Sequence, residues 1–170
     1  MSGIIDKGPR FAKILGDYGE HLVLAQLARS GFVVSHADQT GLDVIAYKPS
    51  TKQRLGITVK SLTRIRGTES HSVNIFRENK RDRKKLLDAC EAFGCEPWIA
   101  AYVECENYAD LYLISLANYD SKFRSKEQRA VYTWAMTKTR KDEYALDPEV
   151  RHIRTDFKFS NWWPASPSVS

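Results

Sequence analysis

Two charged residues interrupt short apolar stretches that otherwise have the pattern of β-strands. Asp43 lies within residues 42–47, Lys60 lies within residues 55–61, and Thr58 precedes the lysine by two positions. Carboxylates hold hard cations such as Mg²⁺ through oxygen and leave coordination positions for water and a phosphate oxygen. A lysine ammonium can stabilise charge on a phosphate in the transition state or, with a lowered pKa, help to activate the attacking water. These residue types therefore suit metal-assisted hydrolysis of a phosphodiester.

The three residues come together if their strands pair as a hairpin. A turn centred between Ser50 and Thr51 gives facing residues whose numbers sum to 101, which places Asp43 opposite Thr58. Lys60 then lies one diagonal step away on the same face, within reach of a long side chain. The pattern predicts that an acid, a hydroxyl and an ammonium share one spot on a sheet. The alternative is a cross-strand salt bridge between Asp43 and Lys60 on a solvated face.

A further acidic residue, Glu20, lies in a helix-like stretch. Residues one or two turns away on the same face are small or apolar: Gly16, Val23, Leu24 and Leu27. A carboxylate on such a stripe is expected to be at least partly buried, and its burial is unfavourable unless a cationic group meets it. Glu20 is therefore a second candidate acid for the site. The alternative is an ordinary acid on the surface of a helix.

The elements that would position these residues can be read from periodicity and turn residues. Residues 17–30 are rich in Ala and Leu, lack proline and lead into Gly31, which indicates a helix with a glycine C-cap. A second, amphipathic helix is predicted over residues 79–93, before Gly94. Strands are predicted over residues 32–34, 42–47, 55–61, 97–104 and 110–116. The predicted core is a mixed α/β (α+β) fold in the order αβββαββ.

The pattern becomes weaker beyond about residue 118. Residues 126–136 have a helical pattern, and residues 150–159 suit an edge strand. Residues 164–170 are expected to form a disordered tail. We therefore expect a single domain over residues 1–163, with a C-terminal extension from about residue 118.

Taken together, Glu20 in a leading helix, Gly41-Leu42-Asp43 at the start of one strand and Ile57-Thr58-Val59-Lys60-Ser61 in the next resemble the PD-(D/E)XK nuclease superfamily. Archaeal Holliday junction resolvases, many restriction enzymes and some intron-encoded endonucleases belong to it. The resemblance covers residues 17 to 116 and implies a restriction-endonuclease-like core, a central mixed sheet flanked by helices. It also implies that Asp43 is the central metal ligand, Lys60 the catalytic lysine and Glu20 an accessory acid, with Mg²⁺ or Mn²⁺ as cofactor and DNA as substrate.

The chain departs from the superfamily pattern at Thr58. Most active members carry Glu, Asp or Gln there, and a threonine hydroxyl is a weaker, neutral ligand for Mg²⁺. The backbone carbonyl of Val59 and water would then do more of the coordination, within a candidate ligand set of Asp43, Thr58, Val59 and Glu20. We therefore consider three functions for the chain. The first is a metal-dependent endonuclease acting on DNA, and the second, which Thr58 favours, is a catalytically impaired DNA-binding or regulatory module on the same fold. The third is an RNA-processing enzyme on the same scaffold.

Basic residues that would contact backbone phosphates lie between residues 64 and 84. In the fold that the chain resembles, the second helix flanks the cleft, so phosphates could dock there with a salt-dependent contribution to binding. The candidates lie before that helix and in its first turns: Arg64, Arg66, Arg77, Lys80, Arg81, Arg83 and Lys84. The alternative for the basic run is a solvated helix face without a partner.

The overall composition indicates a globular protein inside the cell. Hydrophobic residues make up 42% of the chain, enough to bury a core, and the net charge of +5 favours a polyanionic partner. No apolar run approaches the roughly 18 residues of a membrane span, and no secretory signal is evident, so we expect a cytoplasmic location without a membrane partner. Cys90, Cys95 and Cys105 have no Cys-x-x-Cys spacing, which argues against a zinc site or a disulfide framework. A homodimer is expected if both strands of a duplex are cut.

Overall fold

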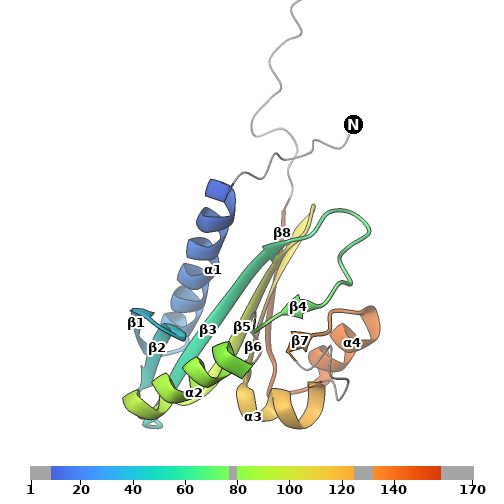
Figure 1. Ribbon diagram of the computed structural model, residues 1–170. Coiled ribbons are helices and arrows are strands. Elements are labelled where there is room, and N and C mark those ends of the chain that lie inside the picture. Colours follow the sequence, from blue (N-terminus) through green and yellow to red (C-terminus); the bar gives the residue numbers. More distant parts are fainter. Residues whose placement is uncertain (1–8, 77–79, 125–131, 158–170) are drawn as a thin grey trace, which may run out of the picture.

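The main sheet of the protein has six strands in the order β1-β2-β3-β5-β6-β8 (Figure 1). The structure is a computed structural model that describes residues 9–76, 80–124 and 132–157. The six strands are β1 (Val33–Gln39), β2 (Leu42–Lys48), β3 (Gln53–Thr63), β5 (Glu96–Glu104), β6 (Tyr108–Ser115) and β8 (Arg151–Asp156). In this sheet β3 and β5 run parallel and the other neighbouring pairs are antiparallel. The expected mixed sheet is therefore confirmed.

Helices flank this sheet (Figure 1). Helix α1 (Pro9–Arg29) packs against β1, β2 and β3, and α2 (Lys80–Phe93) packs against β2, β3 and β5. The remaining elements are α3 (Leu116–Asn118), the π-helical turn η1 (Tyr119–Phe123), α4 (Lys138–Leu146) and a small sheet of β4 (Val73–Asn74) and β7 (Thr133–Trp134). The predicted αβββαββ order is present, with the two-residue strand β4 inserted before α2.

The buried hydrophobic residues form two clusters, one that includes residues of α1 and one that includes residues of α2. The first contains side chains of α1, β2 and β3, including Val23, Val44 and Ile57. The second contains side chains of α2, β5 and β6, including Leu86, and it also takes in Trp134 from the C-terminal part of the chain. Residues beyond 118 thus share a core with the central sheet.

The predicted register between β2 and β3 is confirmed. Val44 pairs with Ile57 and Lys48 pairs with Gln53, so the numbers of facing residues sum to 101. Register is strongly specified here because a shift by one residue would turn every buried side chain to the opposite face.

Helix α1 begins earlier than predicted, at Pro9 rather than near residue 17. Proline fits the first turn of a helix, and Leu15 is only 6% exposed, so burial of this first part offsets the low helix propensity of Gly16. The helix ends as predicted. Gly31 has φ +85°, and its N–H donates to the carbonyl of Ala28 (3.0 Å) in a glycine-terminated C-cap.

The C-terminal part differs from the prediction. Residues 133–134 form strand β7 instead of helix, while residues 125–131 and the predicted tail 164–170 lie outside the described residues. Buried Trp134 and Met136 alternate with half-exposed neighbours, which is the burial period of a strand. The helix of this region is α4, which starts after Thr137, whose hydroxyl accepts the N–H of Arg140.

The predicted edge strand within residues 150–159 is present as β8, which pairs with β6. Trp134 is fully buried, in a cluster with Tyr112 and Tyr144. No described helix combines the length and the apolarity that crossing a bilayer would require.

Candidate active site

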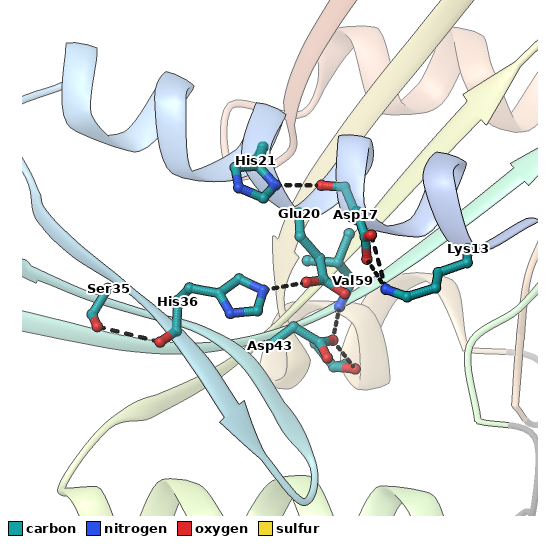
Figure 2. A network of polar contacts seen from close by, with 9 residues as sticks. Lys13, Asp17, Glu20, His21, Ser35, His36, Asp43 and Val59 are labelled. Carbon is teal, nitrogen blue, oxygen red and sulfur yellow. Dashed lines mark hydrogen bonds and ion pairs between the residues drawn. The ribbon is translucent and has the colours of Figure 1, made fainter.

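The backbone pairing of β2 with β3 ends at the Val44–Ile57 pair. Beyond this pair, the side chain of Asp43 in β2 forms hydrogen bonds to β3. Oδ2 of Asp43 accepts the backbone N–H of Val59 at 2.6 Å (Figure 2) and the hydroxyl of Thr58 at 3.1 Å. These two bonds fix the orientation of the carboxylate. Its second oxygen, Oδ1, accepts no hydrogen bond from the residues that the structure describes.

Alternation along β3 separates an apolar face from a polar one. Ile57 and Val59 are buried in the cluster with α1, while Thr58 and Lys60 line a pocket with residues of α2. Thr58 is 7% exposed, and its hydroxyl is satisfied by Asp43. Within the described residues Lys60 forms no hydrogen bond or ion pair, so the alternative of an Asp43–Lys60 salt bridge is not what the structure contains.

A pocket of about 140 Å³ opens where the two strands end their pairing. It is lined by the turn between β1 and β2, by β2 and β3, by the segment after β4 and by α2: Thr40, Gly41, Asp43, Thr58, Lys60, Ile75, Phe76, Asp82 and Lys85. The predicted residues Asp43, Thr58 and Lys60 therefore meet in one place. Asp82 and Lys85 join them, although the sequence alone presents these two only as members of a charged helix segment.

Gly41 fixes the turn that leads into Asp43. It has φ +93°, and a Cβ at this position would lie 2.6 Å from both the backbone carbon and the backbone oxygen of Lys85. Glycine alone meets both requirements without strain. The turn before Asp43 and the helix that carries Lys85 are thus in direct backbone contact.

Glu20 lies in a neighbouring cluster and not in the lining of the pocket. Its Oε2 is 2.5 Å from Nε2 of His36 in β1, and its side chain is 21% exposed (Figure 2). The predicted partial burial is therefore confirmed, but the group that meets this carboxylate is a histidine. The ring of His36 also stacks on His21, with ring centroids 6.0 Å apart. No sequence spacing indicates the Glu20–His36 contact, because it depends on how α1 lies across β1.

No family model and no curated protein matches the sequence. The structure is similar to that of Hjc, a Holliday junction resolvase from the archaeal hyperthermophile Archaeoglobus fulgidus, with a TM-score of 0.50 and 15% sequence identity. The match covers 74% of this chain and 85% of the resolvase. The chain has the restriction-endonuclease-like fold. This is the fold of the PD-(D/E)XK nucleases, so the expected architecture is confirmed.

Resolvase-like nucleases of this fold generally use divalent metals. No cluster of three or more His, Cys, Asp and Glu occurs among the described residues. Mg²⁺, however, usually keeps several waters and is held by one or two carboxylates together with substrate phosphates. The pocket offers the carboxylates of Asp43 and Asp82 and the hydroxyl of Thr58, so its donors fit a hydrated ion of this kind.

A second hollow in this restriction-endonuclease-like fold is larger, about 520 Å³, but it differs in chemistry. It lies between the C-terminal end of α1 and the start of β8, and its lining includes Leu27, Trp98 and Leu113. No Asp or Glu lines it. Of these two hollows, only the smaller one is therefore lined by carboxylates among the described residues.

Two of the predicted phosphate-binding residues are engaged within the fold. The guanidinium of Arg64 donates to the carbonyls of His71 (3.2 Å) and Ser72 (2.8 Å), which holds the loop after β3. Arg83 forms an ion pair with Asp120, linking α2 to η1. Both arginines therefore have a structural contact that phosphate binding would have to replace.

Of the other predicted phosphate-binding residues, three are exposed, and the side chains of two lie outside the described residues. Arg66, Arg81 and Lys84 are exposed, and Lys84 forms a surface ion pair with Asp88 one turn along α2. Exposed pairs of this kind contribute little and are readily exchanged for another anion. Arg77 and the side chain of Lys80 lie outside the described residues.

Proposed function

We propose that the protein is a metal-dependent endonuclease that hydrolyses DNA phosphodiester bonds with Mg²⁺ or Mn²⁺. The observation that supports it most is the meeting of Asp43, Thr58 and Lys60 in one pocket at the end of the β2–β3 ladder. Asp43 would hold the ion through Oδ1, with the Thr58 hydroxyl and the Val59 backbone carbonyl as further ligands. A bound divalent ion supplies Lewis-acid polarisation of the phosphate and a more acidic water. Glu20 would act as the accessory acid from α1.

Lys60 would contribute charge rather than metal binding. Its ammonium lines the pocket without an ion-pair partner among the described residues, so it is available to a phosphate oxygen. A cation held there would stabilise negative charge as it develops in the transition state. We assign Lys60 this role in catalysis.

The substrate class follows from the fold neighbour and the charge of the chain. The neighbour is a Holliday junction resolvase, and this chain carries a net charge of +5, with exposed Arg66 in the loop after β3 and exposed Arg81 and Lys84 in the first turns of α2. We infer that DNA is the substrate, with backbone phosphates bound by these residues. Cuts on both strands of a duplex or a junction would be made by a homodimer.

The test is cleavage of a panel of supercoiled plasmid, linear duplex, four-way junction, single-stranded DNA and matched RNA, with Mg²⁺ and with Mn²⁺. Lys60→Ala and Asp43→Asn should each lower the cleavage rate by about 100-fold or more, because each removes a group aimed at the reacting phosphate or its metal ion. Lys138→Ala and Asp142→Asn on exposed α4 are the matched controls and should cleave like the wild type. Wild-type rates in the Lys60 and Asp43 variants would refute the assignment, and cleavage of RNA alone would assign the substrate to RNA.

Thr58 favours a second function, a DNA-binding module without catalysis, because its neutral hydroxyl stands where active enzymes of this fold usually have a ligand of higher affinity. Calorimetric titration with Mn²⁺ separates the two functions. The endonuclease should bind Mn²⁺ in a manner that depends on Asp43. The module should bind DNA in chelator, show no Asp43-dependent Mn²⁺ binding and leave every substrate intact.

A further inference from the structure

Helix α2 carries a carboxylate on the face that it turns toward the sheet. Asp82, Leu86 and Cys90 follow one another at intervals of four residues, and Leu86 and Cys90 are 1% and 2% exposed. The side chain of Asp82 is itself only 23% exposed. It lines the same pocket as Asp43 and Lys60. Two carboxylates, one from β2 and one from α2, therefore face a common space.

We propose that Asp82 supplies the second carboxylate of the divalent-cation site, the charge that Thr58 does not provide from β3. This inference rests on the proposed metal-dependent function and adds a ligand to it. A Mg²⁺ site of the usual kind needs one or two carboxylates, with waters and substrate oxygens completing the coordination. Asp43 and Asp82 meet that requirement, whereas Thr58 in place of an acid on β3 leaves Asp43 as the sole carboxylate that the sheet contributes to this pocket.

The contact between Asp82 and Lys85 is compatible with exchange of the ammonium for a metal cation. Its Oδ1 lies 3.4 Å from the ammonium of Lys85, longer than the roughly 2.7–2.9 Å of a good charge-assisted hydrogen bond. Both side chains are partly exposed at the pocket. At Oδ1 a divalent ion would replace the Lys85 ammonium, and Lys85 would then be available to a phosphate.

The position of Asp82 relative to Asp43 is set by the backbone. The turn at Gly41, two residues before Asp43, contacts the Lys85 backbone, one helical turn after Asp82. The two carboxylates are thus carried by elements that touch each other directly. Such a support lets a site form with little rearrangement when an ion binds.

The experiment is calorimetric titration of the full chain with Mn²⁺, comparing wild type with Asp43→Asn, Asp82→Asn and Asp88→Asn. Asp88 lies on the exposed side of the same helix, so its variant is the matched control for loss of one negative charge. We expect the Asp82 and Asp43 variants each to bind Mn²⁺ about tenfold or more weakly, since loss even of a group behind a metal ligand commonly costs about 10–100-fold. The Asp88 variant should stay within about twofold of wild type.

A variant that introduces a carboxylate on β3 provides a second, independent test of the proposal. Thr58→Glu combined with Asp82→Asn should recover Mn²⁺ affinity relative to Asp82→Asn alone, because the charge re-enters the same pocket. Asp82→Ser, a neutral residue that also suits the start of a helix, repeats the loss in a chain whose α2 is less disturbed.

The possible failures are distinguishable. Unchanged Mn²⁺ affinity in Asp82→Asn, with affinity lost in Asp43→Asn, would overturn the role of Asp82 and leave the proposed endonuclease standing. Unchanged affinity with a lowered melting temperature would assign Asp82 to stabilising the first turn of α2 alone. Absence of Mn²⁺ binding by the wild type would overturn the metal-dependent function together with this ligand.

Discussion

Within the pocket, the side chain of Thr58 has two structural effects. Its hydroxyl donates to Asp43, and its buried position in β3 places no charge in the core of the sheet. An acid at this position would face the carboxylate of Asp43 directly, and like charges facing each other across a sheet are destabilising. Thr58 therefore stabilises the pocket of this chain, and the proposed second charge would come from another element.

Thr58→Val tests this function because it replaces the hydroxyl with a methyl group of similar size. The Oδ2 of Asp43 would keep the N–H of Val59 but lose its second donor, at a cost of about 1–2 kcal/mol in the free energy of unfolding. Urea denaturation of Thr58→Val and of Thr58→Ser, which keeps the hydroxyl, measures the difference. A Thr58→Val midpoint equal to that of the wild type would mean that the hydroxyl does not support Asp43.

Sequence spacing predicts some residues of the pocket and not others, for a physical reason. Asp43, Thr58 and Lys60 could be predicted because the period of a strand and the position of one turn fix which residues share a face. Asp82 carried a usable signal in its spacing from Leu86 and Cys90, but its charged neighbours on α2 obscured it. His36 had no local signal, since its contact with Glu20 joins two elements packed in space.

At the scale of elements, the position of α1 depends on how closely its backbone approaches β3. A Cβ at Gly19 would lie 2.0 Å from Oγ of Ser61 and 3.4 Å from Cβ of Tyr102. Gly16, one turn earlier, would place a Cβ with nothing within 4 Å. The sequence shows two glycines in a helix but not which of them faces the sheet.

Gly19→Ala should therefore destabilise the protein, by about 1–3 kcal/mol, because the added methyl overpacks the interface between α1 and β3. Gly16→Ala is the matched variant and should stabilise it by about 0.5–1 kcal/mol, since alanine is the better helix former. Denaturant unfolding of both proteins gives the comparison. Equal shifts of the two midpoints would show that α1 does not approach β3 as described.

At the scale of the whole molecule, the sheet is completed by an edge strand held by one buried carboxylate. Asp110 of β6 is 1% exposed and accepts two hydrogen bonds from Arg154 and one from His152, all at 2.8 Å. Burial alone raises the pKa of Asp110, but the bonds from Arg154 and His152 outweigh it, so its pKa lies below the ordinary value. These contacts connect β8, at the far end of the chain, to the central strands.

Arg154→Met should lower the free energy of unfolding by about 1–3 kcal/mol near neutral pH, because it leaves a buried carboxylate with fewer donors. The lowered pKa of Asp110 means that its contribution is present above its unfolded value, about 4, and is lost as pH falls through the folded value. In the variant the folded pKa rises, so the acid loss should begin at higher pH. Melting temperatures from pH 3 to 7, with Arg151→Met as the control, measure this. Superimposable profiles for the two variants would contradict it.

The hydrogen bond from the Val59 amide to Asp43 also bears on the choice between ions. Because Oδ2 is engaged by the chain, Asp43 can offer an incoming cation one oxygen rather than two. Ca²⁺ takes about six to eight oxygens and often a bidentate carboxylate, whereas Mg²⁺ is smaller, octahedral and retains water. In the proposed metal site this backbone amide would therefore disfavour Ca²⁺ and favour the smaller and more strongly hydrated Mg²⁺.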